Sequence, residues 1–186
     1  QMNYWPAEVT NLSDLHLPFL NYLYNMAVVQ PQWQGYARTL LGQSEGWACF
    51  TENNIFGGCS AWKATQYPEA GAWYCDHLWQ HYRYTLDLDF LRQTALPVML
   101  SATRLWMERL VMGSDGRWEC PGEWSPEHGP VENATAHSQQ IVWNLFHTTL
   151  QAIDALGLQD AGIDQTFYNR LRAQFDLLDD GLDRKS

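Results

Sequence analysis

The carboxyl groups best suited to chemistry lie in one segment, WECPGEWSPEHGP, residues 118–130. A general acid needs a carboxyl group that stays protonated near neutral pH, so that it can donate its proton to a leaving group. An apolar flank such as Trp124 and Pro126 disfavours the ionised form of a neighbouring carboxyl group. Glu127 therefore fits the role of a general acid, and Glu123 is the alternative. Prolines make a regular helix unexpected here, so the two glutamates need not share a face.

A second loop with a similar mixture of side chains is GWACFTENNIFGGCSAW, residues 46–62. Carboxylates and amides make forked hydrogen bonds to hydroxyl groups, and flat rings cover apolar C–H faces, so this mixture suits sugars. A place in the core is the alternative for any tryptophan, although the loop positions favour binding for Trp124 and, less strongly, for Trp62. The predicted binding residues, with one from the helix between the loops, are Glu52, Asn53, Asn54, Phe56, Trp62, Trp73, Trp124 and His128.

Metal and redox chemistry are not indicated by the remaining polar residues. His77 and His81 have the spacing that could place two imidazoles on one metal ion, but no acidic third ligand follows at a recognisable spacing. We therefore predict no metal site and no cofactor. The four cysteines form no C-x-x-C pair and are expected to be buried free thiols: Cys49, Cys59, Cys75 and Cys120.

The elements that must position these loops are helical in pattern, and no segment alternates like a strand. Ser13 or Asp14 could cap the first helix, Pro97 fits the first turn of a later one, and Gly157 could end another. The pattern in residues 69–85 puts Trp73, His77 and Tyr84 near one face. Helical spacing of apolar residues covers 20–27, 36–41, 69–85, 87–113, 142–153 and 167–178. We expect an all-α array of antiparallel helix pairs, with short turns on one side and long loops on the other.

Composition and charge exclude several classes of protein. The chain has 186 residues, of which 46% are hydrophobic, enough for one sizeable core in one domain or in part of a larger one. With 11 basic and 21 acidic residues, it offers no positive field for nucleic acid. No apolar run has the roughly 20 residues that a membrane span needs. The opening QMNYWPAEV lacks an initiator Met and a signal peptide, so we expect the chain to be the middle of a longer polypeptide.

Four segments resemble successive blocks of glycoside hydrolase family 95, the inverting α-L-fucosidases and α-L-galactosidases. They are QMNYWPAEVTNLSDLHLPF, GAWYCDHLWQHYRYTLDLDFL, SPEHGP and QQIVWNLFHTTLQA, in the family's order and over nearly the whole chain. The resemblance implies that residues 1–186 form roughly half of an (α/α)6 toroid, truncated at both ends.

The same resemblance implies a function and a site. In that family the glutamate of SPE is the general acid, which carries over to Glu127 and favours it over Glu123. The family's TEN and the aromatic segment after it line the sugar pocket, which carries over to Glu52, Asn53 and Phe56. The resemblance therefore implies an exo-acting glycosidase that takes terminal sugars from oligosaccharides or glycans, in an extracellular or periplasmic location.

The sequence also departs from the family's pattern. The Asn-x-Asn pair that holds the catalytic water would lie upstream of residue 1, and the Asp-Gly-Asn motif of the base would lie downstream of residue 186. Phe50 stands where many members have a histidine, and NATAHSQQ, residues 133–140, replaces an acidic-Gln start of a helix. We therefore expect the flanking parts of the same polypeptide to complete the site. L-fucose, L-galactose and related sugars all stay open.

The absent base residues also support a function of another class. The chain could be a non-catalytic carbohydrate-binding or scaffold module that kept the helices and aromatic loops of a glycosidase. The reading frame on both sides would discriminate between the two, because an enzyme needs the Asn pair and the downstream Asp.

Overall fold

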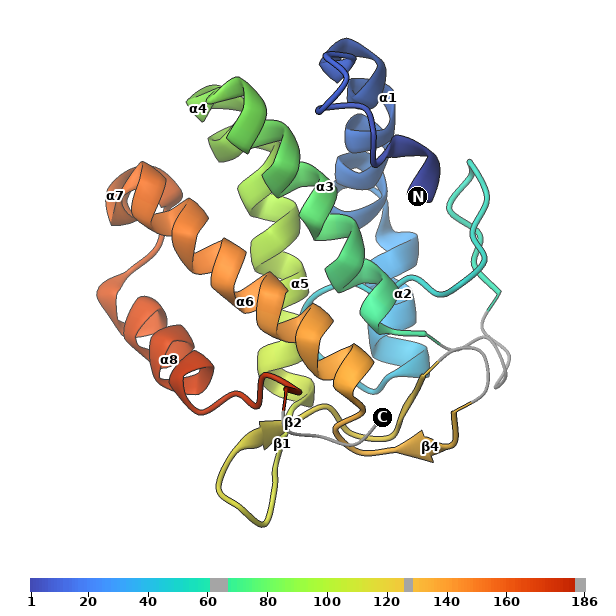
Figure 1. Ribbon diagram of the computed structural model, residues 1–186, viewed down its shortest axis with the longest axis vertical. Coiled ribbons are helices and arrows are strands. Elements are labelled where there is room, and N and C mark those ends of the chain that lie inside the picture. Colours follow the sequence, from blue (N-terminus) through green and yellow to red (C-terminus); the bar gives the residue numbers. More distant parts are fainter. Residues whose placement is uncertain (61–66, 126–128, 183–186) are drawn as a thin grey trace.

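The computed structural model describes residues 1–60, 67–125 and 129–182, and these residues are mainly helical (Figure 1). The expected all-α class is confirmed. Eight α-helices occur in the described ranges: α1 (Ser13–Tyr24), α2 (Pro31–Leu40), α3 (Glu69–Thr85), α4 (Leu88–Phe90), α5 (Leu96–Arg109), α6 (Ala136–Leu156), α7 (Leu158–Ala161) and α8 (Gln165–Asp176). Short 3-10 and π turns cover Met2–Tyr4, Asn25–Val29 and Leu91–Ala95.

Local signals explain where most of these helices begin and end. Pro97 lies in the first turn of α5, and Gly157, at φ 77°, follows the last residue of α6, both as predicted. Thr135 and Asp164 cap α6 and α8 with side-chain oxygens. The prediction that Ser13 or Asp14 caps α1 was wrong, because Leu12 is the N-cap and makes no side-chain cap.

The helices pack as an array in which α3 and α6 lie side by side and run in the same direction (Figure 1). Helix α5 runs back behind them and contacts both, α8 packs against α6, and α1 packs against α3. Short turns join α3 to α4 and α6 to α7 at one end. At the other end, residues 41–68 connect α2 to α3 and residues 110–135 connect α5 to α6. This end, called the loop end below, carries the second connection. The first connection leaves this end before residue 61 and lies beside the junction of α1 and α2, where Tyr22 donates to the carbonyl oxygen of Asn54 and Trp33 to that of Gly57 (Figure 1). The expectation that both long loops share one end is therefore not confirmed for this part of the first loop.

Two short antiparallel strand pairs in the second connection were not predicted. Strand β1 (Val111–Met112) pairs with β2 (Trp118–Glu119), and β3 (Glu123–Trp124) pairs with β4 (Val131–Glu132). Two-residue strands are too short to show an alternating pattern in the sequence. The β3–β4 pair matters for the site, because it closes the base of residues 125–130.

Several tryptophans are buried in the core, so for these residues the expected alternative to sugar binding, a place in the core, is correct. Trp33 and Trp47 are buried, and each indole N–H donates to a backbone carbonyl, at Gly57 and Val98 respectively. Burying a tryptophan costs little when its polar atom keeps such a partner. These two bonds attach the 41–60 segment to the helices.

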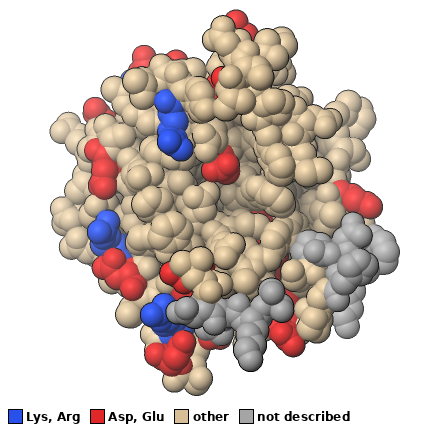
Figure 2. All heavy atoms as spheres, in the orientation of Figure 1, with Lys and Arg blue, Asp and Glu red and all other residues tan. Residues whose placement is uncertain are grey.

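The surface over α3 and α6 carries few charged groups. Figure 2 shows isolated basic side chains and scattered acidic ones around a largely uncharged centre. Such a surface suits a neutral, hydroxyl-rich ligand better than a polyanion. In the described ranges, no helix combines the length and apolar character needed to cross a bilayer.

Candidate functional site

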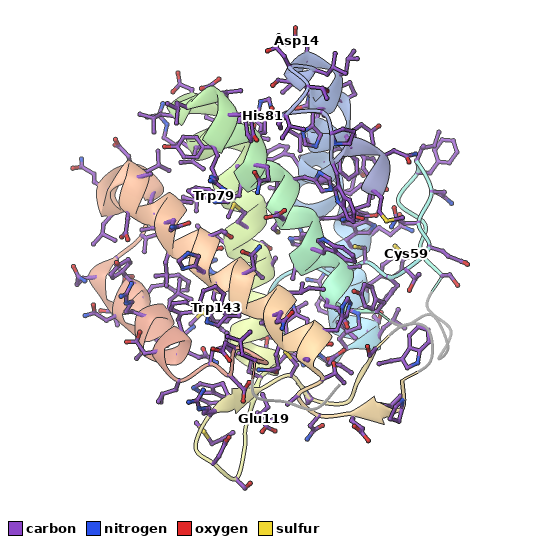
Figure 3. The ribbon with its side chains drawn as sticks, in the orientation of Figure 1. Asp14, Cys59, Trp79, His81, Glu119 and Trp143 are labelled. Atoms are coloured by element: carbon purple, nitrogen blue, oxygen red, sulfur yellow. The ribbon has the colours of Figure 1, made fainter. Side chains whose placement is uncertain are left out.

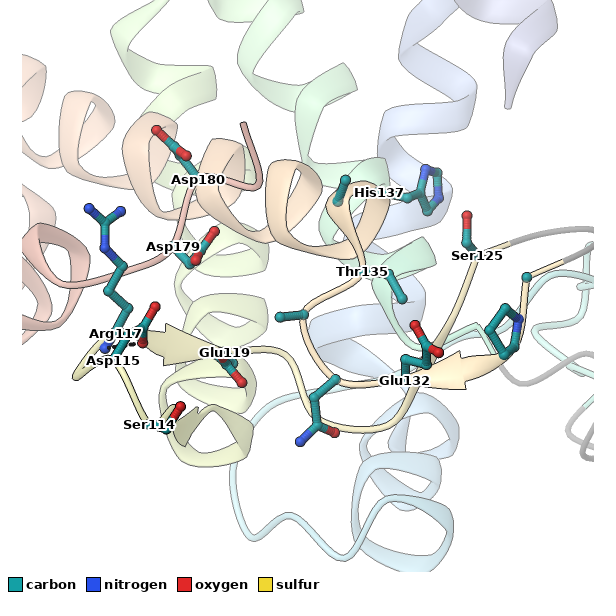
Figure 4. A pocket seen from close by; sticks show the side chains of 15 residues that line it. Ser114, Asp115, Arg117, Glu119, Ser125, Glu132, Thr135, His137, Asp179 and Asp180 are labelled. Atoms are coloured by element: carbon teal, nitrogen blue, oxygen red, sulfur yellow. Dashed lines mark hydrogen bonds between the residues drawn. The ribbon is translucent and has the colours of Figure 1, made fainter. Parts of the chain in front are cut away.

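The predicted general acid Glu127 lies outside the described residues, as do Trp62 and His128. The described residues on either side of it, Ser125 and Gly129, line a cavity of about 840 Å³ at the loop end (Figure 4). His137, in the first turn of α6, also lines this cavity. The described residues that flank Glu127 therefore face a space large enough for a small sugar.

His137 is the best-placed polar side chain in this wall. Its Nε2 hydrogen-bonds the hydroxyl of Tyr67, which precedes α3. Burial lowers the pKa of His137, so its imidazole is neutral at pH 7, and burial raises the pKa of Tyr67. A neutral imidazole and a neutral phenol can both exchange hydrogen bonds with sugar hydroxyls. No motif or spacing indicates this pair, because 70 positions separate the two residues.

The predicted binding residue Trp73 lies beside His137 on the exposed face of α3. Their rings meet edge to face with centroids 6.0 Å apart, and the ring of Trp5 lies 6.1 Å from Trp73 on its other side. A second cavity, of about 410 Å³, is lined by Trp5, Trp73 and Gln80 among others. His77 and Tyr84 line it too, so the predicted shared face of Trp73, His77 and Tyr84 is confirmed. The structure thus assembles a row of rings along the face shared by α3 and α6.

The four predicted residues of the 46–60 segment are used in different ways. Asn53 donates from Nδ2 to the hydroxyl of Tyr74, the residue next to Trp73, across 2.9 Å. Asn54 shapes its own turn, because its Oδ1 accepts from the backbone N–H groups of Phe56 and Gly58. Glu52 and Phe56 are exposed, Phe56 by 81%. None of the four lines either cavity, so their contact with a ligand stays a prediction.

Strand β3 holds the other two predicted residues of the 118–130 segment. Trp124 is half-buried and pairs with Val131. Glu123, the alternative general acid, is 1% exposed, and its Oε1 accepts from Nε and Nη2 of Arg109 at 3.0 and 2.7 Å. A carboxylate sealed from solvent and bound to a guanidinium is poorly placed to donate a proton to a ligand. The geometry therefore gives Glu123 a structural role.

His81, one of the two spaced histidines, has an acidic partner that the sequence did not indicate. Oε1 of Glu8 lies 2.7 Å from Nδ1 of His81 and 2.7 Å from Nδ1 of His16. These three ligand-type atoms lie within 4.8 Å of one another, but the distances fit two N–H donors on one carboxylate oxygen. His77 extends the network, because its Nδ1 lies 3.0 Å from Nε2 of His16. Hydrogen bonds thus account for the cluster without a metal ion.

The protonation states of this cluster follow from its bonds. Glu8 is ionised and only accepts, so Nδ1 of His16 carries a proton and Nε2 of His16 accepts from His77. Burial lowers the pKa of His16, and burial together with the neighbouring His16 lowers the pKa of His77 to about 4.

The four cysteines are free thiols, as expected. Three of them are buried, and Cys59, which Figure 3 labels together with His81, is half-buried.

Comparison with known proteins gives consistent matches. A family model described as the glycosyl hydrolase family 95 catalytic domain matches residues 1–179. The probable alpha-fucosidase A of Aspergillus niger is 33% identical over 192 aligned positions, covering 98% of this chain and 24% of that protein. The alpha-L-fucosidase 2 of Arabidopsis thaliana is 31% identical, covering 84% of this chain and 20% of that protein. The chain thus spans a quarter or less of the length of these relatives.

Proposed function

Because the chain belongs to glycosyl hydrolase family 95, we propose that it is part of the catalytic domain of an inverting, exo-acting glycosidase, with Glu127 as general acid. The names of the two relatives favour α-L-fucosides as substrates, with α-L-galactosides as the second class. The sugar is taken from the end of an oligosaccharide or glycan. An extracellular or periplasmic location stays a prediction.

The observation that carries this proposal is the cavity at the loop end. Ser125, the first residue of the SPE motif, and Gly129, two positions after Glu127, line it together with His137. In Figure 4 the side chains of Ser125 and His137 lie close to each other at one side of this space. A sugar bound there would meet a hydroxyl and a neutral imidazole, with the indole of Trp73 beside the imidazole. This set of groups suits hydroxyl and C–H recognition.

The proposed chemistry divides between this chain and the rest of the polypeptide. Glu127 protonates the leaving oxygen, while a base on the opposite face of the sugar activates a water molecule, with roughly 6.5–9.5 Å between the two carboxyl groups. We assign the base and the water-holding residues to the flanking segments. Helices α3 and α6 would then belong to the inner layer of an (α/α)6 toroid, of which residues 1–186 form about half.

The experiment compares Glu127→Gln with the unaltered full-length polypeptide on two aryl α-L-fucosides. Loss of a proton donor should reduce turnover strongly for a poor leaving group and much less for an activated one, because an activated phenolate leaves without protonation. Asp160→Asn, at an exposed site in α7, is the matched control and should change neither rate. Equal losses on both substrates would contradict the role of Glu127.

The non-catalytic module makes a different prediction in the same experiment. It would bind a fucosylated oligosaccharide in calorimetry and release no sugar, even with both flanking segments present. Detection of the released anomer by proton NMR separates the two functions and also tests inversion.

A further inference from the structure

Two buried carboxyl groups from distant segments meet beneath the SPE loop. Glu69 is the first residue of α3 and is 0% exposed, and Glu123 in β3 is 1% exposed. Their carboxyl groups lie within hydrogen-bonding reach of each other. Buried carboxylates are costly unless they are paired or protonated, so the charges and donors around these two groups determine where a proton lies.

The donors around the pair are unevenly shared. Arg109 gives two N–H groups to Oε1 of Glu123, and the hydroxyl of Ser138 donates to Oε1 of Glu69 across 2.7 Å. No donor among the described residues reaches Oε2 of Glu69. Two ionised carboxylates that are buried this close together would repel each other, so one of them carries a proton. Arg109 favours the ionised form of Glu123, which leaves the proton on Glu69.

The other ionisable groups around the pair do not change this assignment. Tyr67, before α3, and Cys120, between β2 and β3, both have pKa values raised by burial, so they are neutral at pH 7. Asp179, after α8, adds negative charge near Cys120. Burial, and then the charge of Glu123, raise the pKa of Glu69 well above its ordinary range. Arg109 is the cation that the described residues bring to Glu123.

We propose that Glu69 is a positioning residue that stays protonated and donates a hydrogen bond to Glu123, thereby fixing β3 and the start of the SPE loop. This inference rests on the proposed role of Glu127, which follows Glu123 by four positions. Arg109 adds a bond to the carbonyl oxygen of Pro121, so two residues of the connection, Pro121 and Glu123, are attached to the end of α5. Because β3 pairs with β4, a displacement of Glu123 would also displace β4, and so both ends of the SPE loop would move.

The proton on Glu69 has a thermodynamic signature. Its folded-state pKa is raised, so the folded protein binds a proton that the unfolded chain releases above its ordinary carboxyl pKa of about 4.3. This contribution to stability is fully present below that pKa and is lost as pH rises through the folded-state pKa. Glutamine at the same position would donate to Glu123 and accept from Ser138 at every pH.

The test measures thermal unfolding of the full-length polypeptide and of Glu69→Gln between pH 5 and pH 9. The variant should lose less of its unfolding temperature towards alkaline pH than the unaltered protein. Its kcat at the optimum should stay within about two-fold, because the amide keeps both hydrogen bonds. Glu69→Leu removes the donor and should lower kcat by roughly ten- to a hundred-fold with little change in KM, since a misplaced acid weakens the transition state more than binding.

Two results would overturn the proposal. Identical pH dependence of unfolding in the unaltered protein and Glu69→Gln would mean that Glu69 holds no extra proton. A loss of kcat in Glu69→Gln as large as in Glu69→Leu would mean that donation to Glu123 is not its function. Asp160→Asn serves as the control in both assays. Failure of the proposed function is a separate result, because the unfolding profile does not depend on whether Glu127 is the acid.

Discussion

Glu8 and His81 are hydrogen-bonded across 2.7 Å, although 73 positions separate them in the chain. Nδ1 of the imidazole donates to Oε1 of the carboxylate, and both side chains are buried. His16 donates to the same oxygen, so one carboxylate joins the segment before α1 to α1 and to α3. Glu8 therefore holds together three segments of the chain beside the second cavity.

We expect Glu8→Ala to lower the free energy of unfolding by about 3 kcal/mol, because it leaves two buried N–H donors without an acceptor. Glu8→Gln should cost much less, since its amide oxygen can still accept from both rings. Urea titration of the two variants tests this difference. Asp14→Ala, at an exposed site in α1, is the control and should change stability by less than about 1 kcal/mol. Equal costs for Ala and Gln at position 8 would contradict the proposed bonding.

We expect stability to fall as pH drops from about 6.5 to about 4, in part because of His77. Its pKa is lowered to about 4, so the unfolded chain takes up a proton first and the folded state loses stability across this window. His77→Asn keeps a donor at the position of Nδ1 without titrating, and should flatten the dependence. Unfolding temperatures measured at several pH values provide the comparison. An unchanged slope in the variant would show that His77 does not contribute.

Removal of metal ions should leave the unfolding temperature unchanged. The atoms of Glu8, His16 and His81 that could bind a metal are already engaged with one another in hydrogen bonds. Dialysis of the protein against EDTA, followed by calorimetry and elemental analysis, tests this expectation. One zinc ion per chain, with a lower unfolding temperature after its removal, would make the prediction of no metal site wrong.

We expect Trp73→Ala to raise KM for an aryl α-L-fucoside by about ten-fold, which corresponds to the loss of roughly 1.4 kcal/mol of ring contact with the sugar. Trp73→Phe should retain part of the affinity. Trp143→Ala is the matched control, because that ring packs on His147 and Phe175 and lines neither cavity. An effect on KM of the same size in the control would point to general destabilisation.

Residues 1–186 expressed alone should show no hydrolysis that depends on Glu127, because the proposed base and water-holding residues lie elsewhere in the polypeptide. Large apolar side chains such as Trp5, Val9 and Leu15 are exposed, and each Å² of apolar surface that stays in water forgoes about 25 cal/mol. The piece should therefore self-associate on a sizing column. Release of phenol that disappears in Glu127→Ala would reveal a base within these residues.

The sequence by itself determined the helices, because their signals are local. The spacing of apolar residues predicted α3 over 69–85, Pro97 predicted the first turn of α5, and Gly157 predicted the end of α6. These signals act within a few residues of the chain, so no tertiary contact is needed to read them. The family was also evident from sequence, through ordered motifs such as SPEHGP.

Only the tertiary structure decided which polar groups face one another. The partners of His81, Glu123 and His137 are Glu8, Arg109 and Tyr67, and no spacing in the chain indicates any of these pairs. The packing of α3 against α1 and α6 brings their faces together, and burial then fixes which carboxyl or imidazole holds a proton. A hydrogen bond depends on distances of about 3 Å between side chains, whereas a sequence pattern specifies only the face of a helix on which a side chain lies.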